Sequence, residues 1–194
     1  MRLVILGAPG SGKGTQAARL KAALGVPHIS TGDLLRAAVA AGTPLGLKAK
    51  AVMEAGHLVS DDIVLGMLEQ RLAQPDVRAG FILDGYPRNL EQVRALDALL
   101  ARMRQPLDAV LKLRVPSDVI IARTELRHKA EGRADDDPAT VRKRLEVYAE
   151  QTAPVAEHYT RAGILRLVDG VGALDEVFAR IMAALGAPRA VVSR

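Results

Sequence analysis

The chain has 194 residues, a net charge of +5, no Cys, and only 3% aromatic residues among 49% hydrophobic ones. This length suits one domain with a full hydrophobic core, and the lack of Cys excludes a disulfide framework, a thiolate zinc site and a cysteine nucleophile. No apolar run approaches the roughly 20 residues that cross a bilayer, and the N-terminus reaches a glycine loop too early for a secretory signal. We therefore expect a cytoplasmic protein with no membrane partner.

The positive charge has two candidate explanations. One is a surface that binds nucleic acid, and the other is a site that gathers arginines around a small polyanionic ligand. Lys and Arg form no continuous basic run here, and aromatic residues that would stack on bases are scarce. The small ligand is favoured, and we expect no nucleic-acid partner.

Short apolar runs alternate along the chain with Ala/Leu/Arg-rich stretches that have helical spacing. Strands that alternate with helices indicate an α/β fold with a parallel sheet and helices on both faces. The predicted strands are residues 3–6, 27–30, 81–83, 109–115 and 164–168, and the clearest predicted helices are residues 15–24, 90–101 and 117–127.

Two stretches fit this alternation poorly. Residues 31–80 are too long for one crossover helix and contain glycine-punctuated helical pieces, which indicates an inserted helical lobe. Residues 127–138 are polar and turn-rich between two helices, which is typical of a mobile loop. Residues 187–194 lack periodicity and are predicted to be a frayed tail.

A glycine loop, GAPGSGKGT at residues 7–15, follows the first predicted strand and opens the first helix. Gly7, Gly12 and Lys13 fit the phosphate-loop pattern, in which backbone N–H groups converge on phosphate oxygens and a lysine neutralises their charge. The following helix adds the positive end of its dipole. A turn that binds nothing is the alternative, and it would not explain the lysine.

The loop departs from the general pattern at one position. Gly14 stands where many phosphate loops have Ser or Thr, and the hydroxyl comes one residue later, at Thr15. The residue after the lysine therefore has no side-chain oxygen with which to coordinate Mg²⁺ directly.

Six further motifs follow the glycine loop: STGDLLR (30–36), GHLVSDD (56–62), FILDGYPRNLEQ (81–92), EGRADD (131–136), RKRLEVY (142–148) and TAPVAEHY (152–159). With the glycine after the lysine, the loop resembles that of the nucleoside monophosphate kinases, and these motifs extend the resemblance to the adenylate kinase family in its short-lid form.

The resemblance implies a P-loop NTPase three-layer fold, with a five-stranded parallel sheet in a single domain over residues 1–194. It also implies a helical lobe at about 30–59 that binds the monophosphate, and a short lid at about 126–136. The implied reaction is reversible phosphoryl transfer between MgATP and AMP, giving two ADP, by a monomer. A UMP/CMP-type kinase and a non-catalytic nucleotide-binding switch stay open as alternatives.

By resemblance, one group of residues binds ATP or stabilises the transferring group. Arg123 has a plainer alternative, a cation that stabilises the end of its helix. The ATP-binding residues are predicted to be Gly10, Ser11, Gly12, Lys13, Gly14, Thr15, Arg127 and Gly172. The catalytic residues are predicted to be Lys13, Arg88, Arg123, Arg133 and Arg144.

A second group is expected to bind AMP. Thr31 is the specificity residue in this interpretation, because UMP/CMP-type relatives tend to carry Ala there; alternatively it is a helix N-cap. Gln92 is expected to hydrogen-bond adenine. The AMP-binding residues are predicted to be Thr31, Arg36, His57, Leu58, Val59, Gly85, Tyr86, Pro87, Arg88, Gln92, Arg133 and Arg144.

Carboxylates are expected to serve the metal and the lid. Asp84 ends a buried apolar run next to the glycine loop, a place suited to holding Mg²⁺ through water, and Asp33 is expected to share that role. Asp135 and Asp136 are expected to pair with lid arginines or to form a solvated turn. No zinc site is expected, and none of the four histidines is assigned to chemistry.

Overall fold

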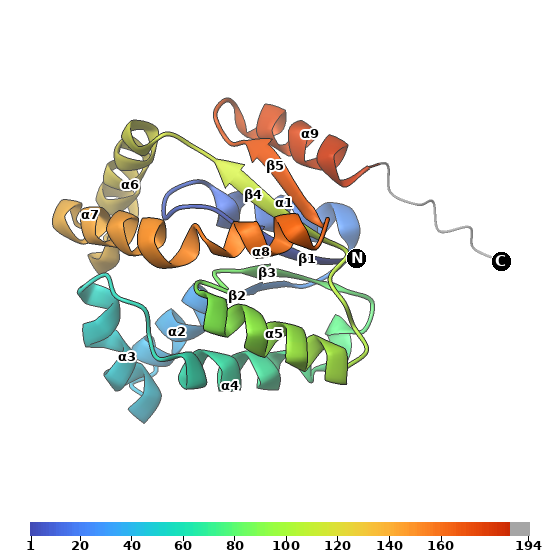
Figure 1. Ribbon diagram of the computed structural model, residues 1–194. Helices are drawn as coiled ribbons and strands as arrows, with labels where there is room; N and C mark the ends of the chain where they lie inside the picture. Colours follow the sequence, from blue (N-terminus) through green and yellow to red (C-terminus); the bar gives the residue numbers. More distant parts are fainter. Residues whose placement is uncertain (187–194) are drawn as a thin grey trace.

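The computed structural model describes residues 1–186, and its centre is a five-stranded sheet in the order β2-β3-β1-β4-β5 (Figure 1). Every neighbouring pair is parallel, so the predicted parallel sheet is confirmed. The observed strands agree with the predicted ones to within one residue at every end. They are β1 Arg2–Leu6, β2 His28–Ser30, β3 Phe81–Asp84, β4 Ala109–Arg114 and β5 Leu165–Asp169.

Helices cover both faces of the sheet, as the near-continuous apolar strands require. Val4 of β1 joins a core cluster with α4, α5 and α8, whereas the adjacent Leu3 joins a second cluster with α1 and α9 on the opposite face (Figure 1). The helices are α1 Lys13–Leu24, α2 Thr31–Ala40, α3 Pro44–Glu54, α4 Asp61–Leu72, α5 Leu90–Arg102, α6 Ser117–Glu131, α7 Pro138–Val147, α8 Val155–Arg161 and α9 Leu174–Leu185.

The long stretch between the second and third strands is helical, since it contains α2, α3, α4 and a 3₁₀ turn, Pro75–Val77. α2 and α3 pack so closely that a Cβ on Gly46 would lie 2.0 Å from the carbonyl oxygen of Ala38. A glycine is therefore required at this crossing. That these helices form a separate lobe with bounds near 30–59 stays a prediction, and residues 187–194, predicted as a frayed tail, lie outside the described residues.

The prediction of a loop over residues 127–138 is wrong in its first part. α6 continues to Glu131 and ends at Gly132, which has the left-handed φ of 63° common at helix C-termini. The connection to α7 is residues 132–137, with a 3₁₀ turn, Ala134–Asp136. Asp137 then caps α7 by accepting from the backbone N–H groups of Ala139 and Thr140.

A π-helical turn, Tyr148–Thr152, joins α7 to α8. Within residues 1–186, no helix combines the length and the apolar character that a membrane span requires.

Candidate nucleotide site

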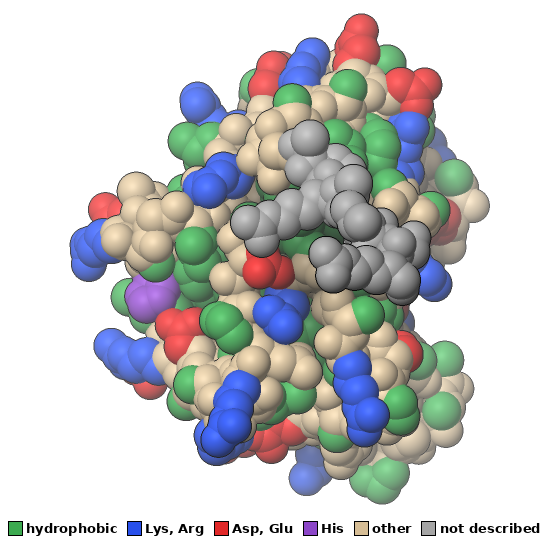
Figure 2. All heavy atoms as spheres, turned by 90° about the vertical axis from the view of Figure 1, so that its right-hand side faces the viewer, with side chains coloured by type: hydrophobic (Ala, Val, Ile, Leu, Met, Phe, Trp, Pro, Cys, Tyr) green, Lys and Arg blue, Asp and Glu red, His purple; other side chains and the backbone are tan. Residues whose placement is uncertain are grey.

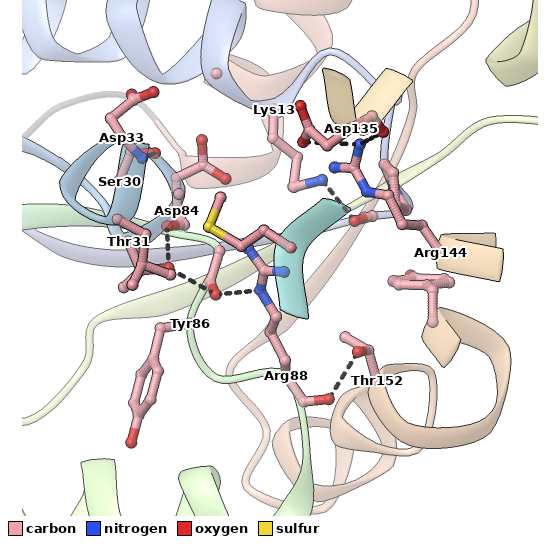
Figure 3. Close-up of a pocket in the computed structure, with 18 of the residues that line it drawn as sticks. Lys13, Ser30, Thr31, Asp33, Asp84, Tyr86, Arg88, Asp135, Arg144 and Thr152 are labelled. Atoms are coloured by element: carbon pink, nitrogen blue, oxygen red, sulfur yellow. Dashed lines mark hydrogen bonds and ion pairs between the residues drawn. The ribbon is translucent and has the colours of Figure 1, made fainter. Parts of the chain in front are cut away.

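A cavity of about 460 Å³ lies at the carboxyl ends of the central strands, where parallel sheets commonly bind ligands (Figure 3). Segments far apart in the chain line it, including the glycine loop, the N-terminus of α2, the β3–α5 loop and α7. All the predicted site residues except Ser11, Arg123 and Gly172 contribute to its lining. Those that do are Gly10, Gly12, Lys13, Gly14, Thr15, Thr31, Asp33, Arg36, His57, Leu58, Val59, Asp84, Gly85, Tyr86, Pro87, Arg88, Gln92, Arg127, Arg133 and Arg144.

The glycine loop is shaped for an anion by its backbone. Gly10 and Gly12 have φ values of 79° and 90°, which only glycine adopts without strain, and Lys13 is the first residue of α1. The Lys13 ammonium donates to the carbonyl oxygens of Gly7 (2.6 Å) and Ala8 (2.8 Å). Burial lowers the pKa of Lys13 to about 8, against the opposing effect of Asp84. A phosphate in the loop would relieve the cost of burying this cation.

The three predicted residues that do not line the cavity lie in or contact the glycine loop and the loop after β5. Ser11 is 2% exposed, and its backbone carbonyl accepts a 3.4 Å hydrogen bond from Arg123. Arg123 also donates to the carbonyl of Gly170 (3.1 Å), so it joins the glycine loop to the loop after β5. Gly172 lies in that same loop, where a Cβ would be 2.5 Å from a carboxylate oxygen of Glu176.

The alternative interpretation of Arg123, a cation at a helix end, is wrong. α6 ends at Glu131, two turns beyond Arg123, so the guanidinium is too far from the last carbonyls to stabilise them.

Thr31 lies at the junction of α2 and the β3–α5 loop. Its hydroxyl donates to the carbonyl oxygen of Gly85 (2.9 Å), which also accepts from Arg88 Nε (2.6 Å). The interpretation of Thr31 as the helix N-cap is wrong by one residue, since the hydroxyl of Ser30 accepts from the backbone N–H of Asp33. Thr31 is 3% exposed and its hydroxyl has turned toward the neighbouring loop instead.

Arg88 is the central cation of the cavity, and Figure 3 shows it entering from a different element than Lys13 or Arg144. Burial, and then repulsion from Arg144, lower the pKa of Arg88 to about 10. The backbone of Arg88 is fixed by Thr152, whose hydroxyl donates to its carbonyl oxygen (2.7 Å). A bound anion would stabilise the charged form of a guanidinium that is buried among other cations.

The arginines near the lid are held by carboxylates, which confirms the expected pairing of Asp135 and Asp136. Asp136, with a fully buried carboxylate, accepts two hydrogen bonds from Arg127 (2.6 and 2.7 Å) and one from Arg144 (3.0 Å). Asp135 lies 3.1 Å from Arg144 and 3.9 Å from Arg36. These arginines are thus oriented before any ligand arrives.

Asp84 is the carboxylate best placed for a metal ion. It is 8% exposed, and a Cβ on Gly14 would lie 3.6 Å from its Oδ2, so it faces the first turn of α1. The Nε2 of His28 lies 3.4 Å from the same oxygen, a neighbour that sequence analysis missed. Asp33 fits less well, because it is exposed and accepts a 2.6 Å hydrogen bond from Arg36. Residues 1–186 hold no group of three or more His, Cys, Asp or Glu arranged to bind a metal.

The sequence of the chain is similar to those of known proteins. A sequence model of the family described as "Adenylate kinase" matches residues 5–164. An adenylate kinase of Xanthomonas euvesicatoria pv. vesicatoria (strain 85-10) is 66% identical over 186 residues, which cover 96% of this chain and 100% of that protein. An adenylate kinase of Stenotrophomonas maltophilia (strain K279a) is 63% identical over 187 residues, with 96% and 100% covered. The chain belongs to the adenylate kinase family.

The connection between α6 and α7 is short, and that it serves as a lid stays a prediction. Residues 132–137 alone separate α6 from α7, and they carry one 3₁₀ turn and no strand. The pairing of Asp136 with Arg127 and Arg144 therefore supplies the main ionic link between the two helices across this connection.

Proposed function

We propose that the protein transfers the terminal phosphoryl group of MgATP reversibly to AMP, giving two ADP. The observation that carries the proposal is that one cavity holds two separate sets of anion-binding groups. The first is the glycine loop with Lys13, and the second is Arg88 with Arg36. A nucleotide-binding switch needs only one such set, whereas transfer between two nucleotides needs both.

The glycine loop and α6 form the ATP side of the site. Loop amides and Lys13 bind the β- and γ-phosphates, and the dipole of α1 adds to their attraction. Arg127 lines the cavity, whereas Arg123 donates to the carbonyl oxygens of Ser11 and Gly170. The resemblance puts both arginines at the ATP phosphates, with Arg127 beside the adenine or ribose. Because of the contacts of Arg123, we propose instead that Arg127 binds the phosphates and that Arg123, with Gly172, lies on the nucleoside side.

The β3–α5 loop and α2 form the AMP side. Arg88 and Arg36 grip the AMP phosphate, since a guanidinium matches the spacing of phosphate oxygens. Gln92 hydrogen-bonds the adenine ring, and Thr31 is the specificity residue beside it. Residues 57–59 and 85–87 complete the wall of the AMP pocket.

The reaction asks for alignment and charge stabilisation rather than covalent help from the protein. An oxygen of the AMP phosphate attacks the γ-phosphorus of ATP while the bond to the β–γ bridging oxygen breaks, and ADP leaves. The attacking oxygen is already anionic, so no general base is assigned. Arg133, Arg144 and Arg88 stabilise the negative charge on the transferring group.

Mg²⁺ is the implied cofactor, and the residues present fit it. Asp84 would hold the ion through water, with a lesser contribution from Asp33, and phosphate oxygens and water would supply the remaining ligands, as Mg²⁺ prefers. The ion neutralises phosphate charge when bound. Gly14 lies beside this carboxylate, since a Cβ there would be in ordinary van der Waals contact with Oδ2 of Asp84, at 3.6 Å.

We further propose a cytoplasmic monomer whose partners are ATP, AMP and ADP, without nucleic acid. On the face seen in Figure 2, Lys and Arg side chains are interspersed with acidic and apolar ones instead of gathering into one basic patch. Such a mixed surface gives no extended match to a phosphate backbone.

Coupled assays with AMP, UMP, CMP and GMP as acceptors test the proposal. We expect AMP to be strongly preferred, and ADP to form from both ATP and AMP. A preference for UMP or CMP would indicate a UMP/CMP-type kinase instead. Tight ATP binding with no ADP formation would indicate a non-catalytic switch.

A further inference from the structure

The side chain of Gln92 is held from two sides by groups of opposite hydrogen-bonding character. Its Nε2 donates to a carboxylate oxygen of Asp61 (2.7 Å), and its Oε1 accepts from the backbone N–H of Arg88 (2.7 Å). Gln92 is 2% exposed and lines the AMP side of the cavity. The amide is therefore buried, oriented and at the wall of the cavity.

These two partners allow only one orientation of the amide. A carboxylate accepts hydrogen bonds, so it must face the NH₂ group, and a backbone N–H donates, so it must face the oxygen. Rotating the amide by 180° would set oxygen against carboxylate and NH₂ against N–H. Each mismatch leaves buried polar groups unsatisfied.

Asp61 is itself anchored. It is the first residue of α4, and both of its carboxylate oxygens accept from Nδ2 of Asn89 at 3.1 Å. Asn89 in turn caps α5 by accepting from the backbone N–H of Gln92 (2.8 Å). The carboxylate thus has a fixed position relative to the amide that it orients.

The orientation decides what Gln92 offers to a base. A primary amide has two N–H donors and two lone pairs, so one donor and one lone pair remain for a ligand. Adenine presents a donor at its 6-amino group beside an acceptor ring nitrogen, a pair that a glutamine amide matches. Hypoxanthine and guanine present the reverse at positions 6 and 1, an acceptor oxygen beside an N–H donor.

We propose that Asp61 is a specificity-determining positioning residue, which locks the Gln92 amide in the orientation that accepts a 6-aminopurine monophosphate and rejects a 6-oxopurine monophosphate. The inference rests on the proposed function, because it concerns the acceptor pocket. Asp61 acts through Gln92 and does not contact the reacting atoms.

A purely structural role for Asp61 is the competing interpretation, since the same hydrogen bonds join α4 to α5. The two roles differ in what they do to acceptor choice. A structural defect lowers the turnover of every acceptor alike, whereas a released amide changes the ratio between a 6-amino and a 6-oxo base. IMP is the better probe, because it differs from AMP at positions 6 and 1 and lacks the additional 2-amino group of GMP.

The test measures kcat/KM for AMP and for IMP, with saturating MgATP, in the wild type, Asp61→Asn and Asp62→Asn. Asp61→Asn keeps the shape but can present either a donor or an acceptor to Gln92. Asp62→Asn is the matched control, because it removes the same charge from the same first turn of α4 at a side chain that is exposed. Asp61→Ser provides a second variant without a carboxylate if Asp61→Asn does not fold, as judged by thermal unfolding.

We expect the AMP-to-IMP ratio of kcat/KM to fall about tenfold in Asp61→Asn, because one of the two locks on the amide is lost. The ratio in Asp62→Asn should stay at the wild-type value. An unchanged ratio in a folded, active Asp61 variant overturns the role of Asp61 alone, and so does an equal change in Asp62→Asn. A wild-type protein that phosphorylates neither nucleotide overturns the proposed function itself.

Discussion

The glycine loop and the arginines that Asp136 joins, Arg127 and Arg144, are held in place by different means. The loop depends on its backbone: two glycines with positive φ turn their N–H groups inward, and Lys13 is held by carbonyl oxygens of the same loop. The arginines depend on carboxylates from other elements, above all on Asp136, which holds Arg127 of α6 and Arg144 of α7.

Because of this difference, substitutions in the two regions should affect different properties, activity in one case and folding stability in the other. A change in the loop removes a ligand contact while the surrounding β1 and α1 stay buried in the core. A change at Asp136 leaves two cations without their shared partner, so it disturbs the protein before any ligand binds. The two regions should therefore fail in different ways.

The loop should show the largest effect on activity. In Lys13→Met we expect kcat/KM for ATP to fall about 10³-fold, because the cation that meets the β- and γ-phosphates is lost. The fold should be retained, since the lysine is a buried cation whose removal does not unpair a carboxylate. Steady-state kinetics and thermal unfolding measure the two quantities.

Lys21→Met is the matched control for this substitution. Lys21 lies in the last turn of the same helix and is exposed. The kcat/KM of the Lys21→Met protein should stay within about twofold of the wild-type value, as is usual for surface changes. A Lys13→Met protein that keeps most of its activity would contradict the assignment of the loop lysine.

A substitution of Asp136, which joins Arg127 and Arg144, should lower the stability more than a substitution in the glycine loop. In Asp136→Asn we expect the free energy of unfolding to fall by about 1–3 kcal/mol at pH 7, because a fully buried carboxylate that joins two arginines is neutralised. Denaturant unfolding measures the change. Asp175→Asn is the control: its partner is Arg19 and its side chain is 89% exposed, so the unfolding midpoint should hardly move.

The stabilisation by the Asp136 carboxylate should also depend on pH and be lost in acid. Burial alone would raise the pKa of Asp136, but hydrogen bonds and attraction from Arg127, with Arg144, hold it below its ordinary value. Its stabilisation is therefore complete above the unfolded pKa of about 3.9 and is lost as the pH falls through the folded pKa. The difference between wild type and Asp136→Asn should be constant from neutral pH to about 4.5 and shrink in stronger acid. A difference that persists unchanged at pH 2 would mean that the ion pairs do not carry it.

Local patterns in the sequence were sufficient for the sheet and the glycine loop. β1 and β4 are apolar runs between helical stretches, and the loop motif fixes its own backbone through its glycines. The end of α6 was placed too early, because its charged last turn has the composition of a loop. The signal that could have corrected it is Gly132, a typical residue at a helix C-terminus.

The other features that the sequence did not predict depend on contacts between distant segments. Ser30 and Thr31 are both common N-cap residue types, and the bond from Thr31 to Gly85 shows that Thr31 is engaged elsewhere. Asp61 carries no signal of its own, since an acid in the first turn of a helix is common. Its role follows from the approach of α4 to α5, which brings it to Gln92, 31 positions along the chain.

The smallest expected effect is the pH dependence of ATP affinity that follows from the protonation of Lys13. It tests whether the charge of this lysine contributes to phosphate binding in the loop. With the pKa of Lys13 lowered to about 8 by burial, the free protein loses this charge above pH 8, whereas bound phosphate favours the charged form. The affinity for ATP should thus be constant below pH 7.5 and weaken above pH 8, by up to about tenfold per pH unit, with uptake of a proton on binding. Calorimetric titrations at pH 7 and pH 9, in buffers with different ionisation enthalpies, measure both. Lys13→Met should abolish the proton uptake, and Lys21→Met should retain it. Equal uptake in wild type and Lys13→Met would assign the titration to another group.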